Sequence, residues 1–426
     1  MNLGKTIKYY RLKQDMTQAE LALGICSIPH LSKIENGVYD VNHNTAKQLL
    51  KKLNVDMKEE QAQYTQLKEA LRSFIEAIQF IDMQEAKELA QFLHKREEMI
   101  TRTSFLYTYH LYMLRYHLQN DDIINAKKQQ QILSKNQSSL TYDETLLCAF
   151  FNSLLLMTEH RFSEAKQQLL DIRRKDHCTT HTPMQEIDFA LSQCYTRLHE
   201  HEKAVIHARD ALRIFKQTDN YIHTFQAQLL LATNYASMNM IEDAMRLFKT
   251  LLRHARLFNQ QALYYKTHYH YGIVLKKMKC DQKSYQYLSE CLKYFEKSSE
   301  VYCHCLLATA QVCARLSMNH DQITNMLHEV MALSEKHGFP HLNLQARYSL
   351  LHLKGSNRID HFIENVMLPY FNEADHGPNL VPYAIELAES YQNKGHHEHA
   401  NAILTQYVTK AKNKPVVHKR SFPSPT

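Results

Sequence analysis

Glycine and proline are scarce in this chain of 426 residues, which has only 8 Gly and 9 Pro and no tryptophan. A β-rich fold needs many turns built from these two residues, so their scarcity argues against one. A glycine-rich loop that binds phosphate groups is excluded for the same reason. The chain is therefore expected to consist of helices joined by short loops. Its length indicates at least two structural units or an array of repeats.

The chain also lacks an apolar run of the roughly 18 residues that a membrane span requires, and it does not begin with a secretory signal. Its nine cysteines are scattered along the sequence. We therefore expect free thiols in a cytoplasmic protein that has no membrane partner.

One stretch, Cys303-His304-Cys305, contains the residue types of a metal site. Residues one and two positions apart on a helix do not share a face, and no second paired cluster follows. The histidines of the segment 396–399 have no framework of cysteine or carboxylate ligands and are expected in an exposed polar turn. The sequence therefore predicts no metal site and no cofactor.

Positive charge is concentrated near the start of the chain. The first 56 residues hold eight Lys/Arg and five Asp/Glu, whereas the formal net charge of the whole chain is +7. A small segment with this surplus of basic residues favours a nucleic-acid partner.

Cap and stop signals divide these first residues into short helices. A helix is expected over 3–14. It is followed by Thr17-x-x-Glu20, a capping box that begins a second helix. Leu21 and the next residue face a core, and Gly24 ends this helix after about two turns.

A third helix begins at Ser27, whose side chain can cap it, and ends at Asn36-Gly37, which supplies the left-handed stop. A fourth amphipathic helix is expected near 43–53. Two short helices with a tight turn between them and a supporting helix on each side follow the helix-turn-helix plan.

The motif T-Q-x-x-L-A … S-x-x-x-L-S-K-I-E-N-G resembles the Cro/repressor-type DNA-binding domain over about the first 55 residues. The stretch between Ala22 and Ser27 is one residue shorter than the usual repressor pattern, and its Gly-Ile-Cys-Ser form is similar to that of the PlcR and NprR class. The candidate DNA contacts are Ile28, His30, Ser32 and Lys33 for base edges in the major groove, and Gln18, Arg11 and Lys13 for phosphates.

Two further residues of the motif have expected structural roles. Cys26 lies in the turn between the second and third helices, where a small half-buried side chain is needed. No acid or base is placed to activate its thiol. Glu35 is expected to be structural, because DNA would repel a carboxylate that pointed at it.

The remaining residues contain an internal repeat. A small residue is followed twelve positions later by alanine or serine at the pairs 192/204, 232/244, 272/284 and 388/400, in the context Leu-small-x-x-Tyr for three of the four. The first three copies step by 40 residues. The pattern predicts eight or nine hairpins of two amphipathic helices, which cross closely at the small residues. It resembles the tetratricopeptide repeat, lengthened from its usual length of about 34 residues.

Tetratricopeptide arrays form right-handed superhelices whose concave face binds peptides. An extended peptide exposes backbone donors and acceptors, which amide side chains can satisfy, and basic side chains can meet its carboxylate. The candidate peptide contacts are Asn152, Gln193, Thr196, Thr233, Asn234, Arg115, Lys266, Lys276 and Gln311. For Asn234, an interhelical hydrogen bond explains an amide among apolar neighbours equally well.

A repressor-type domain followed by tetratricopeptide repeats resembles the peptide-pheromone receptors of Gram-positive bacteria, the Rap/Rgg/NprR/PlcR/PrgX class. Length and layout are nearest to the NprR-type members. The resemblance implies a cytosolic quorum-sensing transcriptional regulator, not an enzyme. Such a protein would bind promoter DNA and a short signalling peptide as a homodimer or higher oligomer.

Two alternatives stay open. The chain could instead be a peptide-controlled antagonist of a response-regulator phosphoprotein in the sporulation relay, with an accessory phosphatase-type activity and secondary DNA binding. Glutamines of the 61–98 hairpin are candidates for positioning water in that activity, although solvated helix surface explains them too. The third hypothesis is a constitutive regulator without a small ligand.

These observations predict an all-α protein with four segments. They are a helix-turn-helix domain over 1–56, a charged connector over 57–64, a tetratricopeptide-repeat domain for peptide binding and oligomerisation over 65–412, and a disordered tail over 413–426.

Overall fold

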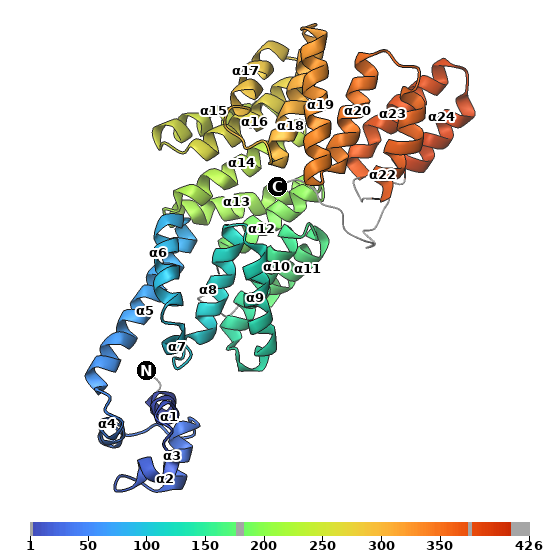
Figure 1. Ribbon diagram of the computed structural model, residues 1–426. Coiled ribbons are helices and arrows are strands. Elements are labelled where there is room, and N and C mark those ends of the chain that lie inside the picture. Colours follow the sequence, from blue (N-terminus) through green and yellow to red (C-terminus); the bar gives the residue numbers. More distant parts are fainter. Residues whose placement is uncertain (1–2, 176–182, 374–376, 410–426) are drawn as a thin grey trace. The chain divides into compact units, whose positions relative to one another are not determined.

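The computed structural model describes residues 3–175, 183–373 and 377–409, and its regular elements within these ranges are all helices (Figure 1). The chain divides into two compact units. Unit 1 comprises Met1–Leu155 and Asp171–Thr182, and unit 2 comprises Leu156–Leu170 and Pro183–Thr426. The disordered tail expected over 413–426 lies outside the described residues.

The helices that begin in unit 1 are α1 (Leu3–Lys13), α2 (Gln18–Ala22), α3 (Ile28–Glu35), α4 (His43–Lys52), α5 (Met57–Phe80), α6 (Met83–His94), α7 (Glu97–Ile100), α8 (Leu106–Gln119), α9 (Ile123–Lys135), the short η1 (Gln137–Ser139) and α10 (Tyr142–Thr158). The segment 57–64, expected to be the connector, is helical and forms the start of α5.

The helices that begin in unit 2 are α11 (Phe162–Lys175), α12 (Met184–Arg197), α13 (His201–Gln217), α14 (Tyr221–Ser237), α15 (Ile241–Leu257), α16 (Gln261–Lys277), α17 (Asp281–Cys291), α18 (Glu300–Arg315), α19 (His320–His337), α20 (Pro340–Leu353), α21 (Ile359–Phe362), η2 (Ile363–Met367), α22 (Leu368–Glu373), α23 (Gly377–Asn393), α24 (His397–Ile403) and η3 (Leu404–Thr409).

The first four helices enclose a small core of their own. Its fully or almost fully buried residues are Ile7, Leu21, Ala22, Leu31, Ile34, Ala46, Leu49, Leu50 and Leu53. These include Leu21 and Ala22, the two residues expected to face a core on α2. Leu12, by contrast, is exposed at the end of α1.

A residue with a left-handed backbone marks the turn inside each hairpin. Among the described residues these are Ile81, Asp121, His160, His199, Asn239, Lys279, Ser317, Gly355 and Gly395, at intervals of 38 to 40 residues. Only two of the nine are glycine, the residue that adopts this conformation without steric cost. The described chain therefore contains nine hairpins, and the expected all-α fold of a helix-turn-helix domain followed by tetratricopeptide-type repeats is confirmed.

The small residues of the repeat lie where the two helices of a hairpin cross closely, as expected. The Ser192 hydroxyl donates to the carbonyl of Ala204 over 2.7 Å, and the Ser284 hydroxyl donates to that of Gly272 over 2.8 Å. A Cβ atom at Gly272 would lie 2.9 Å from the side chain of Leu288. The close approach of the two helices thus depends on residues with little or no side chain.

None of the helices in the described part of the chain is both long enough and apolar enough to cross a membrane. The eight cysteines in that part are all free thiols, as expected.

Candidate nucleic-acid interface and first-helix surface of the repeats

Side-chain caps fix the starts of α2 and α3, the two helices joined by the turn over 23–27. The Thr17 hydroxyl accepts from the backbone N–H of Glu20 over 3.1 Å, and the Glu20 carboxylate accepts from the backbone N–H of Thr17 over 2.7 Å. Ser27 accepts from the backbone N–H of His30 at the start of α3. The expected capping box and the expected start of the third helix are thereby confirmed.

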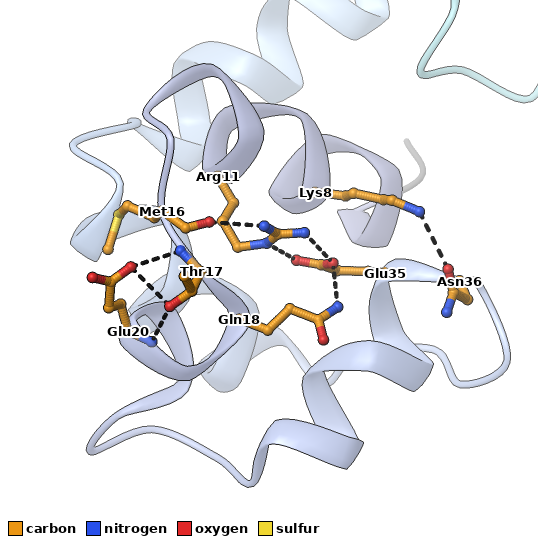
Figure 2. Close-up of polar contacts among 8 residues, drawn as sticks. All are labelled: Lys8, Arg11, Met16, Thr17, Gln18, Glu20, Glu35 and Asn36. Atoms are coloured by element: carbon orange, nitrogen blue, oxygen red, sulfur yellow. Dashed lines mark hydrogen bonds and ion pairs between the residues drawn. The ribbon is translucent and has the colours of Figure 1, made fainter.

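Glu35 joins three helices beneath this turn (Figure 2). Arg11 of α1 donates to its two carboxylate oxygens over 2.6 and 2.9 Å and also to the carbonyl of Met16 over 2.8 Å. Gln18 of α2 donates to the same carboxylate over 2.8 Å. Burial alone would raise the pKa of Glu35, but the hydrogen bonds from Arg11 and Gln18 outweigh it and lower the pKa. The structural role expected of Glu35 is confirmed.

This arrangement corrects one expected DNA contact and constrains another. Arg11 is only 8% exposed and is committed to Glu35, so the expectation that it binds a phosphate is wrong. Gln18, at the start of α2, is half-buried and already uses its amide group on Glu35. The sequence did not reveal the Arg11–Glu35 pair, because the two residues are 24 positions apart in the chain.

The outer side of α3 carries the remaining base-edge candidates. Ile28, His30 and Lys33 are exposed, whereas Ser32 is half-buried. Tyr39, which the sequence did not single out, is also exposed, with its ring 5.5 Å from the Lys33 ammonium. The helix thus presents one cation, one imidazole and apolar surface to the solvent.

Lys13 is exposed on α1, where it donates to the Tyr9 hydroxyl over 3.0 Å. Next to it, α1 contacts helices that follow the domain: Tyr9 donates to Glu98 and Tyr10 donates to Glu60. The Arg102 guanidinium lies 4.0 Å from the centre of the Tyr9 ring. Sequence reasoning missed this aromatic and ionic contact, whose only signal was the pair of adjacent tyrosines in α1.

Asn234 does not face a groove. It is fully buried on α14, donates to the Thr196 hydroxyl and to the Leu230 carbonyl over 2.8 Å each, and pairs with Nδ1 of His201 over 2.8 Å. Its expected peptide contact is therefore wrong, and the interhelical hydrogen bond is the correct alternative. Thr196 is occupied by this same bond, since its hydroxyl accepts from Asn234 and donates to Ser192.

The other peptide candidates of unit 2 are accessible to different degrees. Gln193 and Thr233 are half-buried, and the Thr233 hydroxyl donates to the Leu230 carbonyl over 2.9 Å. Lys266 is exposed on α16. Lys276 of α16 donates to Gln311 of α18, which in turn donates to Ser349 of α20 over 3.1 Å. These contacts link α16, α18 and α20, each of which is the first helix of its hairpin, and they bring Lys276 and Gln311 together.

Desolvation and, to a smaller extent, the positive charge of Arg315 together lower the pKa of Lys276 to about 8, against the attraction of Asp281. The ammonium is therefore held in surroundings that disfavour its charge. An anionic group on a bound molecule would relieve that cost.

Arg115 and Asn152 belong to unit 1. Arg115 of α8 lies about 6 Å from the ring centres of Phe150 and Phe151. The side-chain amide of Asn152 contacts the sulfur of Cys148, and its carbonyl oxygen is buried without a hydrogen-bond partner among the described residues. The buried oxygen is a group that a ligand donor could satisfy.

Comparison with known proteins agrees with this geometry. Residues 7–59 match the family model described as helix-turn-helix. The transcriptional activator NprA of Geobacillus stearothermophilus is 20% identical over 408 residues, covering 92% of this chain and 99% of NprA. Among solved structures, the apo quorum sensor NprR from B. thuringiensis aligns with a TM-score of 0.66 and 19% identity over 82% of this chain and 99% of NprR.

NprR in complex with its cognate peptide NprX aligns equally well, with a TM-score of 0.66 and 17% identity over 82% of this chain and 98% of NprR. A Rap protein complexed with competence and sporulation factor gives a TM-score of 0.68 and 14% identity over 82% of this chain and 98% of the Rap chain. The chain has the fold of the NprR and Rap proteins. In layout, a helix-turn-helix domain followed by repeats, it is similar to NprR, as the sequence motifs indicated.

Further polar residues gather on the first helices of this NprR-like array. Desolvation lowers the pKa of His270 on α16 to about 4 and that of His304 on α18 to about 3, and the charge of Arg197 on α12 contributes to both shifts. Sequence reasoning did not single out Arg197 or His270. Their only signal was a polar residue on an otherwise apolar helix.

Proposed function

We propose that this chain is a transcriptional regulator that binds promoter DNA through α3 and a short signalling peptide through the first helices of its repeats. The observation that carries the proposal is the exposed side of α3, with Ile28, His30 and Lys33 directed to solvent. The buried Glu35 beneath it ties α3 to α1 and α2. A recognition helix held in place in this way, with an exposed cation in its last turn, suits insertion into a major groove.

The proposed peptide site comprises Gln193, Lys266, Lys276 and Gln311, the unit 2 candidates with long polar side chains that are exposed or half-buried. A fold shared with NprR, which has been solved with its cognate peptide NprX, supports a peptide as the ligand. The amides of Gln193 and Gln311 can pair with a peptide backbone, and the two lysines can meet a carboxylate.

Peptide binding would act on DNA binding by linkage. A peptide that binds one arrangement of the repeats better than another shifts their populations by its difference in affinity. A 10- to 100-fold effect on DNA affinity requires only about 1.4–2.8 kcal/mol. In the proposed homodimer or higher oligomer, the helix-turn-helix domain over 1–56, the connector over 57–64 and the repeats over 65–412 would set the spacing of two DNA half-sites.

The experiment is a gel-shift titration of the full-length protein on the promoter region upstream of its own coding sequence, with and without the small-peptide fraction of spent host medium. A change of tenfold or more in apparent affinity supports the proposal. Tight binding that the peptide fraction does not change indicates a constitutive regulator. Absence of specific binding in both arms contradicts the proposal.

A second candidate function is action on a phosphorylated response regulator. A pocket of about 200 Å³ in unit 1 is lined by residues of α5 to α7 and their turns, namely Gln63, Gln66, Leu67, Lys95, Arg96, Glu98, Met99 and Arg102. It combines amides that could orient water with cations that could meet a phosphoryl group. Loss of aspartyl phosphate from a purified response regulator of the host, in the presence and absence of this protein, tests it.

A further inference from the structure

Three side chains with metal-binding atoms meet on α18 and α20. Glu300 and His304 belong to α18, His341 belongs to α20, and their nearest ligand atoms all lie within 4.8 Å of one another. Oε1 of Glu300 is 3.0 Å from Nε2 of His341, and the two imidazole ring centres are 5.6 Å apart. All three residues belong to unit 2.

The local sequence explains why these groups share one side of α18. Residues four positions apart are neighbours on a helix surface, which places Glu300 directly beside His304. The flanking Cys303 and Cys305 point elsewhere, since both are fully buried in two different apolar clusters. The expectation that these cysteines do not share a face with His304 is thus confirmed. The partners of His304 are instead a carboxylate on its own helix and an imidazole on another.

Glu300 provides the clearest sign that the cluster accommodates a cation. Only 11% of its side chain and 7% of that of His341 are exposed. Its Oε1 atom is buried, and its neighbour among the described residues is Nε2 of His341, 3.0 Å away. Unless that nitrogen carries a proton, the oxygen has no hydrogen bond. A buried carboxylate oxygen without a hydrogen bond is costly. A cation held between the two side chains would remove that cost.

The surroundings of His304 disfavour a charged imidazole. Desolvation, together with the charges of His341, Arg197, Lys276 and His270, lowers its pKa to about 3.

We propose that Glu300, His304 and His341 form a binding site for a divalent transition-metal ion, with Zn²⁺ as the best fit. Two imidazoles and one carboxylate are a donor set that zinc accepts, at bond lengths of about 2.0–2.2 Å. Such bonds place tetrahedral ligand atoms about 3.3 Å apart. The observed separations reach that geometry through small side-chain movements. Three protein ligands leave one position for water or for a donor atom of a bound molecule.

The positive charge of Arg197 opposes a cation at this place, and the carboxylate of Glu300 offsets it. The negative charge of Glu300 also favours the charged form of Arg197, whose pKa desolvation lowers. The site would therefore bind zinc more weakly than a site without neighbouring cations. Because Glu300 is the only anionic member of the cluster, zinc binding next to Arg197 requires its carboxylate.

The test uses full-length protein freed of metal with a chelator and then titrated with Zn²⁺ against a chromophoric competitor. We expect one equivalent of Zn²⁺ to bind and to raise the thermal midpoint, because the ion joins α18 to α20. Co²⁺ in place of Zn²⁺ should give the visible absorption of a four-coordinate ion. H304A and H341A should each weaken Zn²⁺ binding at least tenfold and abolish the cobalt spectrum.

Two further variants separate loss of the site from loss of the fold. E300Q keeps the shape of the side chain but removes its charge, so it should also weaken Zn²⁺ binding at least tenfold. H397A removes an exposed histidine at the start of α24 and should leave binding unchanged. If H304A, H341A and E300Q all keep the wild-type affinity and stoichiometry, or if the wild-type protein binds no Zn²⁺, the proposal is wrong.

Discussion

Arg11 donates hydrogen bonds to both carboxylate oxygens of Glu35, over 2.6 and 2.9 Å, inside the helix-turn-helix domain. The side chain of Glu35 is completely buried, and that of Arg11 is 9% exposed. Because Gln18 donates to the same carboxylate, one acidic group holds three helices together. The orientation of the proposed recognition helix therefore depends on a buried ion pair that does not itself touch the solvent-facing side of α3.

Replacing Arg11 by methionine should destabilise the helix-turn-helix domain by about 3–5 kcal/mol, because the charge of Glu35 would stay buried without its partner. Hydrogen exchange of the backbone amides of α1 to α3 in the full-length protein measures the change. The double variant R11M/E35M replaces both charges by apolar groups and should recover most of the loss. Equal protection of R11M and wild type would contradict the role assigned to the pair.

The same pair predicts a dependence of stability on acid. The pKa of Glu35 is lowered in the folded protein from an ordinary value of 4.5. The unfolded chain therefore binds the proton more tightly, and the stabilisation is present above about pH 4.5 and is lost as the pH falls through the folded pKa. The protection factors of the amides of α1 to α3, which are exchange rates corrected for the intrinsic effect of pH, should fall more steeply between pH 6 and pH 3 in wild type than in E35Q. Parallel curves would show that another carboxyl group is responsible.

Replacing Lys33 by alanine should relax the sequence preference of DNA binding, at a cost of about 1–3 kcal/mol on the preferred site. Lys33 is exposed on α3, whereas its matched control Lys87 is exposed on α6 outside the domain. K87A removes the same charge and should keep the preference of wild type. Site selection from a randomised DNA library compares the three proteins. An unchanged preferred site in K33A would mean that α3 reads DNA through other residues.

Replacing Asn234 by alanine should destabilise unit 2 by about 1–3 kcal/mol, because the hydroxyl of Thr196 and the imidazole of His201 lose a buried partner. Chemical denaturation of N234A, T196A and the double variant measures the coupling between the two side chains. Additive losses would show that the 2.8 Å contact between them contributes nothing. T233A, whose hydroxyl bonds only to the carbonyl of Leu230 on its own helix, is the matched control.

The local features of this fold were predictable from the sequence because each depends on residues a few positions apart. The capping box of Thr17 and Glu20 and the start of α3 at Ser27 are of this kind. The repeat spacing was visible in the small residues. The left-handed residues of the hairpin turns recur with the same spacing. Because few of them are glycine in this chain, the positions of glycine in the sequence do not reveal these turns.

Contacts between helices that are distant in the chain could not be predicted from the sequence. Asn234 and Thr196 are 38 positions apart, and His304 and His341 are 37 positions apart. Such pairs form only when neighbouring hairpins stack, and helical periodicity gives no partner for a polar residue on an apolar helix. For that reason the sequence predicted a peptide contact at Asn234, where the structure has an interhelical bond, and did not reveal that His341 lies beside His304.

Lys276 offers a test of the electrostatics of the first helices that needs no ligand. Its pKa is lowered to about 8 from an ordinary value of 10.5, because desolvation disfavours the charged form. Between these two values the unfolded chain keeps the proton that the folded chain has lost, so stability should rise with pH. The rise should be at most on the order of 1 kcal/mol per pH unit, since the ammonium is only half-buried. Denaturation midpoints from pH 7.5 to pH 10 should show it in wild type and in K266M, whose exposed lysine lies on the same helix, but not in K276M. A K276M profile that parallels wild type would show that the folded protein holds Lys276 in its charged form throughout this range.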